Sequence, residues 1–300
     1  MAGTKYAHLY KKLAFQDFGP GFCRQGTRMT SDLLGLEVNV DYGAFWTAGK
    51  LGQEPYGPHV HDYNQVMIFM GADMSDLGYL GAEIEFCLGA GEEMEKHMIA
   101  TSTAVLIPRG FPHFPATITR MDKRFLLMEI SITTQLKATP VPLERKIETL
   151  PVAGWGSKYR NKILPLAFIR NGPWHYGPLN PDTHDGAITN IIGTEFPFNI
   201  SYESVRKAPY RFGPIPDKPH SHEFDEFALM LGADTNDLTE LGAEFETGMG
   251  PEIENLEVKE PWAIVFHKGF PHGPGAFLKL HKPMIFAIIR PFVSGGTTKI

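Results

Sequence analysis

The chain has 300 residues, of which 43% are hydrophobic and 21% are charged, and its formal net charge at pH 7 is −6. This length is enough for two domains with a core each. The negative balance leaves no general positive field for a phosphate backbone, which excludes nucleic acid as the main partner. The 31 glycines and 24 prolines favour a turn-rich β protein over a helix bundle.

Cysteine usage and hydropathy bear on the compartment. Only Cys23 and Cys87 occur, without a Cys-x-x-Cys pair, which fits a reducing environment. The N-terminus lacks the apolar segment of a signal peptide, and no apolar run reaches membrane-spanning length. We therefore expect a cytoplasmic protein without a membrane partner.

The first half of the chain contains five segments with the composition of strands. Residues 66–70 are apolar on both faces, which indicates a strand packed on both sides. Residues 82–88 alternate charged and apolar side chains, as a half-buried strand does. The remaining three segments are residues 36–46, 103–107 and 125–132.

Proline and glycine breaks at residues 139–142 and 151–156 interrupt this pattern. We therefore predict an N-terminal domain of residues 1–142 and a C-terminal domain of residues 150–300.

The second half of the chain repeats the first. An offset of 161 residues maps His59 onto His220, His61 onto His222 and Gln65 onto Glu226. An offset of 159 residues maps His113 onto His272, so one loop is two residues shorter. A period near 160 is too long for a solenoid repeat and indicates a duplicated domain.

Both copies contain side chains that suit a metal ion. Alternate residues of a strand share a face, which places His59, His61 and Gln65 together, and likewise His220, His222 and Glu226. His113 and His272 follow glycine- and proline-containing turns and complete the two sets. Imidazole with carboxylate holds divalent first-row metals, so we expect one or two such ions: Fe(II), Mn(II), Ni(II), Cu(II) or Zn(II).

These motifs resemble those of the cupin superfamily. The family's first motif matches His220-x-His222-x3-Glu226, followed by Gly232, and its second matches Pro108-x-Gly110-x-x-His113. The second half departs from the second motif at His267, which replaces the leading proline. The resemblance covers both halves and implies a bicupin. That fold is all-β, with two tandem antiparallel β-barrels of the jelly-roll (double-stranded β-helix) type and few short helices.

One predicted ligand differs between the halves. Gln65 stands where the family has glutamate, which leaves three histidines and a neutral amide in the N-terminal set. Losing one negative charge should raise the Lewis acidity of a bound metal. We expect the two halves to have different roles because of this difference. The alternative is that the N-terminal barrel has lost its function and has only a packing role.

Strand parity also gives candidate substrate-pocket residues. Met67 and Phe69 share the face of the N-terminal histidines, and Ala228 and Met230 share the face of the C-terminal ones. Ordinary core packing is the alternative for these four. Arg109 and Lys268 come shortly before the closing histidines and are candidates for binding an anionic substrate, or else exposed turn cations.

The leading functional hypothesis is a metal-dependent dioxygenase acting on a small aromatic, enolic or diketone-type substrate and using O2. Fe(II) is the favoured metal, and resemblance to cupin dioxygenases implies that Glu226 takes a proton during catalysis. The alternative is a non-oxidative bicupin enzyme: a decarboxylase, isomerase or lyase. A third hypothesis is a metal-containing small-molecule binding protein. A homo-oligomer is compatible with each.

Overall fold

The computed structural model describes residues 5–19, 24–52, 57–168, 172–174, 177–179, 188–192, 195–212, 218–292 and 298–299. Within these ranges nearly all regular structure is β. One short α-helix, α1 (Ser31–Leu34), is capped by the Thr30 side chain and ends at Gly35 with a φ of 67°. The 3-10 helices there are single turns: η1 (Ala7–Leu9), η2 (Gly91–Glu93), η3 (Ile147–Thr149) and η4 (Arg160–Lys162). This confirms the predicted all-β class. No helix in these ranges is long and apolar enough to cross a membrane.

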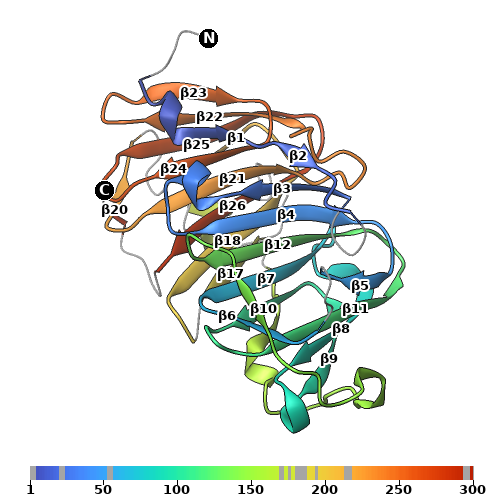
Figure 1. The fold of residues 1–300 in the computed structure, drawn as a ribbon. Coiled ribbons are helices and arrows are strands. Elements are labelled where there is room, and N and C mark those ends of the chain that lie inside the picture. The colour runs from blue at the N-terminus through green and yellow to red at the C-terminus, as the bar shows by residue number, and fades with distance from the viewer. Residues whose placement is uncertain are drawn as a thin grey trace. The chain divides into compact units, whose positions relative to one another are not determined.

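The chain divides into two compact units. The N-terminal unit is Phe15–Leu166, and the C-terminal unit combines Met1–Ala14 with Ala167–Ile300. Each unit is a jelly roll of antiparallel sheets, shown as ribbons in Figure 1.

The N-terminal unit has two main sheets. The first runs in the order β14 (Ile163–Pro165), β10 (Thr103–Ile107), β7 (Asn64–Gly71), β12 (Phe125–Ile132), β4 (Asn39–Phe45), β3 (Gln25–Met29) and β2 (Phe15–Gln16). The second runs in the order β13 (Ala138–Pro140), β6 (His59–His61), β11 (His113–Met121), β8 (Tyr79–Leu88) and β9 (Glu95–Thr101), with β5 (Gly49–Leu51) also on β11. All five predicted strands lie in these elements.

The C-terminal unit repeats this arrangement. Its larger sheet runs in the order β1 (Tyr10–Lys12), β24 (Trp262–Phe266), β21 (Glu226–Gly232), β26 (Met284–Pro291), β18 (Phe198–Val205) and β17 (Ile188–Ile192). The facing sheet runs in the order β19 (Tyr210–Phe212), β25 (His272–Leu280), β22 (Ala243–Met249) and β23 (Glu254–Val258). The described residues of this unit also contain two strand pairs: β20 (Ser221–His222) with β27 (Thr298–Lys299), and β15 (Gly172–Trp174) with β16 (Gly177–Leu179).

A separate hydrophobic core fills each unit. In the N-terminal unit Phe69 and Phe125 of one sheet pack with Phe86 of the other, and all three are fully buried. In the C-terminal unit Phe286 packs with Phe245 and Phe277 across the two sheets. Burying one such ring contributes on the order of 1.5–3 kcal/mol, so these rings dominate the packing. Neither large sheet closes on itself over the described residues, so each predicted barrel is an open sandwich.

The units differ from the predicted domain boundaries at two places. Strand β1 pairs with β24, with Tyr10 opposite Ile264, so the first residues of the chain belong to the C-terminal unit. Strand β14 pairs with β10, with Ile163 opposite Val105, which extends the N-terminal unit to Leu166. Proline and glycine breaks mark turns, but they do not show which sheet a later strand joins.

The repeated Gly-Ala-Asp segments form equivalent tight loops. A Cβ atom on Gly71 would lie 2.3 Å from the Tyr79 carbonyl oxygen, and one on Gly232 would lie 2.4 Å from that of Glu240. Only glycine allows this close approach of two backbone segments. The repeat of this sequence is therefore explained by packing.

Candidate metal centres

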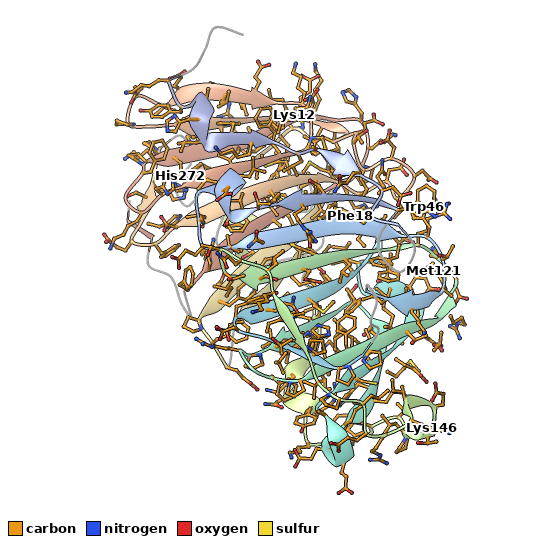
Figure 2. The ribbon with its side chains drawn as sticks, viewed as in Figure 1. Lys12, Phe18, Trp46, Met121, Lys146 and His272 are labelled. Atoms are coloured by element: carbon orange, nitrogen blue, oxygen red, sulfur yellow. The ribbon has the colours of Figure 1, made fainter. Side chains whose placement is uncertain are left out.

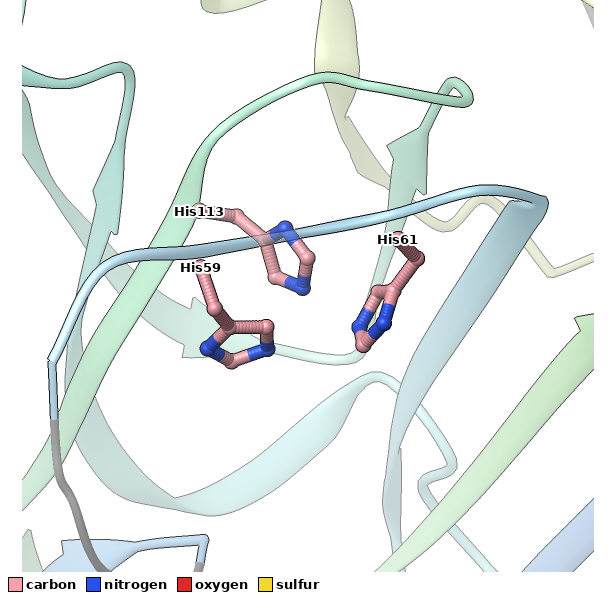
Figure 3. Close-up of side chains that lie close together, drawn as sticks. All are labelled: His59, His61 and His113. Atoms are coloured by element: carbon pink, nitrogen blue, oxygen red, sulfur yellow. The ribbon is translucent and has the colours of Figure 1, made fainter. Parts of the chain in front are cut away.

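Three histidines converge in the N-terminal unit. His59 and His61 project from β6, and His113, the first residue of β11, pairs directly with His59. The ring centroids lie 4.8 Å apart for His59 and His61, 4.4 Å for His59 and His113, and 4.9 Å for His61 and His113. Figure 3 shows the three rings directed toward one another.

The C-terminal unit contains the same geometry. His220 and His272 exchange backbone hydrogen bonds of 2.9 and 2.8 Å, and His222 follows on β20. The ring centroids are 5.0, 4.3 and 5.1 Å apart, each within 0.2 Å of its N-terminal counterpart. His272 begins β25 and is labelled in Figure 2. The structure thus brings together the six histidines predicted from the repeat.

The fourth predicted ligand of each set lies on a different strand from the histidine pair. A bend separates β6 from β7, which contains Gln65, and another separates β20 from β21, which begins at Glu226. The expectation of one continuous strand was therefore wrong. The side chains of Asn64 and Asp225 accept hydrogen bonds of 2.9 Å from the backbone N–H groups of Arg109 and Lys268. These bonds fix each bend to the turn before the closing histidine.

The histidines are oriented as metal ligands. The Nδ1 atoms of His59, His61 and His113 lie 3.1–3.2 Å from backbone carbonyl oxygens, as does Nδ1 of His272 at 3.0 Å. Donation from Nδ1 leaves Nε2 unprotonated, which is the form that binds a metal. The buried Nε2 atoms of His113 and His272 have no hydrogen-bond partner among the described residues. A divalent metal would satisfy them.

Burial favours the neutral form of the N-terminal imidazoles. It lowers the pKa of His61 to about 4 and lowers the pKa of His113 well below its ordinary value. In each set the three ligand atoms lie within 4.8 Å of one another. Both sets therefore fit a metal ion in their donor atoms and their spacing.

At the C-terminal centre the fourth side chain forms an ion pair. Glu226 Oε2 accepts a hydrogen bond of 2.7 Å from Arg290 Nε, and Arg290 Nη1 donates to Asn199 Oδ1 at 2.8 Å. The carboxylate also lies 3.6 Å from Nε2 of His222 and of His272. Burial raises the pKa of Glu226, but the charge of Arg290 and then the two histidines outweigh this and hold it below its usual value. Glu226 is thus a buried carboxylate beside two of the C-terminal histidines, His222 and His272.

At the N-terminal centre the polar groups are rearranged. Gln65 Nε2 donates to Glu129 Oε1 at 2.9 Å and to Ser131 Oγ at 3.3 Å. The Oε1 atom of Gln65 is buried and has no hydrogen-bond partner among the described residues, so it could accept a hydrogen bond or bind a metal ion. The amide has replaced the carboxylate, and a carboxyl group stands on the neighbouring strand instead.

The strand registers show where this carboxyl group has moved. Glu129 pairs with Met67, and in the C-terminal unit Ile288 pairs with Ala228 at the equivalent position. Ser131 pairs with Gln65, whereas the register that pairs Phe227 with Ile289 places Arg290 beside Glu226. The N-terminal unit therefore has an acid where its copy has isoleucine, and serine where its copy has arginine.

A cavity of about 590 Å³ opens onto the N-terminal centre. His59, His61, Tyr63, Gln65 and Glu129 contribute to its lining. Burial, and then the charge of Asp41, raise the pKa of Glu129 to about 8, and Arg28 partly opposes them. Tyr63 stacks on His61 with centroids 4.6 Å apart, where the other unit has Phe224 on His222.

Glu129, Asp41 and Arg28 are functional candidates that the sequence prediction missed. They lie on β12, β4 and β3, and they form one row across the sheet, with Glu129 opposite Asp41 and Asp41 opposite Arg28. Glu129 was detectable in part, because it is the one charged residue in the apolar strand 125–132, and a charge there needs a reason.

The predicted substrate-pocket residues lie elsewhere. Met67 and Phe69 are fully buried core residues and do not line this cavity. Ala228 and Met230 belong to the C-terminal core. Arg109 is exposed and paired with Asp62, and exposed Lys268 lies 3.7 Å from Glu223.

Comparisons with known proteins give a structural likeness only. No protein-family model matches the chain, and no curated protein matches its sequence. Vicilin from hazelnut (Corylus avellana) is 9% identical with a TM-score of 0.62, covering 97% of this chain and 87% of its own. A variant of oxalate decarboxylase from Bacillus subtilis is 8% identical with a TM-score of 0.56, covering 96% and 75%. AerE from Microcystis aeruginosa is 9% identical with a TM-score of 0.53, covering 94% and 98%. At these identities the likeness establishes the fold alone.

Proposed function

We propose that this chain, which has the fold of two cupin domains in tandem, is a metal-dependent enzyme that transfers protons to or from a small organic substrate. The reaction class would be that of a decarboxylase, lyase or isomerase, and the N-terminal centre would be the reaction site. One observation supports this above all. The 590 Å³ cavity is lined by His59 and His61 of the N-terminal triad and by Glu129.

His59, His61 and His113 would hold the metal, and Gln65 Oε1 is available beside them. A divalent ion in this place would act as a Lewis acid toward a substrate carbonyl or carboxylate oxygen. Mn(II) centres are described for oxalate decarboxylase from Bacillus subtilis, one of the structural neighbours. The three-histidine set accepts Fe(II), Mn(II), Ni(II), Cu(II) or Zn(II), so the metal is a matter for measurement.

Glu129 would move the proton. Gln65 Nε2 is the hydrogen-bond donor to Oε1 of this carboxyl group, which fixes its orientation on the cavity wall. Oε2 is then available to exchange a proton with the substrate. A positioned carboxyl group within reach of the reacting atom typically contributes a factor of about 10²–10⁴ to the rate. The apolar walls around it would exclude bulk water.

The C-terminal centre would bind metal without turning over substrate. Its carboxylate, which the sequence suggested as the catalytic residue, is tied to Arg290 in a buried ion pair. A proton acceptor held in this way is a poor base, because Arg290 stabilises its charged form. We therefore assign the acid–base role to Glu129 and a structural metal site to Glu226.

A dioxygenase is the second candidate, because Phe45, Leu51, Phe114 and Leu127 give the cavity the apolar wall that an aromatic or diketone substrate would need. The requirement for O2 distinguishes the two. The structural likeness to a decarboxylase supports the non-oxidative reaction.

The test is solvent-proton exchange without oxygen. Metal-loaded protein is incubated anaerobically in D2O with 2-oxo acids, 3-oxo acids and 1,3-diketones, and deuterium incorporation and decarboxylation are followed by NMR. We expect exchange or carbon dioxide release with some of these compounds. We also expect it to be lost in His59→Ala, reduced about 100-fold or more in Glu129→Gln, and retained in His222→Ala. Turnover that occurs only with O2 would establish the dioxygenase instead.

A further inference from the structure

We propose that the N-terminal cavity selects a carbonyl compound with a single acidic head and an uncharged apolar body, and that it rejects dicarboxylates. This inference rests on the proposed function for its choice of site. It concerns binding, however, and is tested without turnover.

The size of the cavity is the first argument. A volume of about 590 Å³ is enough for a ligand much larger than a two-carbon diacid. Phe45, Leu51, Phe114 and Leu127 make part of the lining apolar. Leu136 and Leu143, which are exposed in the described structure, also belong to the lining. A short diacid would leave this surface uncovered, whereas an alkyl or aryl group would cover it.

The charges of the lining residues are the second argument. Arg28 and Lys137 are the cations among them. The Arg28 guanidinium is held at both ends by Asp41, through Nε to Oδ1 and Nη2 to Oδ2, each at 2.7 Å. The backbone carbonyl of Lys137 accepts a hydrogen bond from His61 Nδ1, and the Lys137 side chain is exposed. A second substrate carboxylate would instead meet the Asp41 carboxylate, which already holds Arg28.

Strand β12 sets the order of these features along the substrate. Ser131, Glu129 and Leu127 lie on one face of this strand, at successive steps of about 7 Å. Ser131 is bonded to Gln65 at the metal end, Glu129 comes next, and Leu127 begins the apolar part. A substrate along this face would place its oxygen atoms at the metal, its exchangeable proton near Glu129, and its body against Leu127.

The test uses a matched pair of ligands that differ at the far end. Calorimetry on the full-length, Zn(II)-loaded protein compares 2-oxohexanoate with 2-oxoglutarate, which has a carboxylate in place of the last part of the alkyl chain. We expect 2-oxohexanoate to bind about tenfold more tightly or better. In the series from pyruvate to 2-oxohexanoate, each added methylene should tighten binding by about threefold to fourfold.

Two variants separate the charge argument from the size argument. Asp41→Asn releases Arg28 and should strengthen 2-oxoglutarate binding at least tenfold, with 2-oxohexanoate changed less than twofold. Leu127→Ala should weaken 2-oxohexanoate about tenfold and leave pyruvate unchanged. Equal affinities for the pair, a preference for 2-oxoglutarate, or no binding by either would overturn the inference. Because deuterium exchange is measured separately, exchange accompanied by dicarboxylate preference would refute this inference and leave the proposed function standing.

Discussion

The buried ion pair of the C-terminal centre allows a quantitative test. In Arg290→Leu the Glu226 carboxylate loses its cation while remaining buried, since both side chains are at most 5% exposed. Breaking one partner of a buried, hydrogen-bonded pair typically costs about 3–5 kcal/mol. Asn199 Oδ1 also loses its donor, which adds about 1 kcal/mol. We therefore expect metal-free Arg290→Leu to lose roughly 4–6 kcal/mol of unfolding free energy in the C-terminal unit.

A bound metal should mask most of this loss. The ion would supply the positive charge that Glu226 lacks in the variant, so the metal should stabilise the variant more than the wild type. The double variant Glu226→Gln/Arg290→Leu, which removes both charges, should recover much of the stability. Because Arg290 helps hold the pKa of Glu226 below its usual value, the pair stabilises the folded state above about pH 4.5, and this contribution disappears as pH falls further.

The assay is denaturant unfolding of EDTA-treated and metal-loaded protein, followed by circular dichroism at pH 7. Lys268→Leu is the matched control, because it removes an exposed cation from the same unit and should change stability by less than about 0.5 kcal/mol. If metal-free Arg290→Leu is no less stable than this control, the assigned role of the pair is wrong. If metal restores wild type and variant equally, Glu226 does not face the ion.

Three further predictions follow from features described above. His61→Ala and His222→Ala should each remove about one equivalent of bound metal by elemental analysis, and unchanged content in either would show that the corresponding triad does not bind metal. Gly71→Ala should destabilise the N-terminal unit by about 2 kcal/mol or more in thermal unfolding, because its Cβ would meet a carbonyl oxygen at 2.3 Å, whereas Gly78→Ala, with 3.4 Å to its nearest atom, should not. The folded pKa of Glu129, about 8, lies above its ordinary 4.5, so its contribution to stability is complete below pH 4.5 and is lost as pH rises to about 8. The stability of Glu129→Gln relative to metal-free wild type should therefore increase by roughly 3–5 kcal/mol between pH 5 and pH 9, and a constant difference would contradict this.

The sequence predicted the features that depend on local pattern and repetition. Ligand spacing in two registered copies identified all six histidines, and alternation identified the main strands. The sequence did not reveal the position of Glu129, because its neighbours are set by cross-strand register. Asp41 lies 88 residues before it and Gln65 lies 64 residues before it. Likewise, the pairing of Glu226 with Arg290 spans 64 residues. Parity along one strand selected Met67 and Phe69, but parity does not distinguish a cavity wall from a filled core.

The strand that precedes each repeat completes the sheet of the other repeat. Strand β1 precedes the first copy and pairs with β24, and β14 precedes the second copy and pairs with β10. This is the arrangement expected if a single-domain ancestor formed a dimer by trading its first strands, and gene fusion later joined the two copies. It also dictates an order of folding during translation. The contiguous N-terminal unit can form first. Strand β1 cannot pair until β24 has been synthesised, roughly 250 residues later, which takes about 10–50 s at ordinary rates of synthesis.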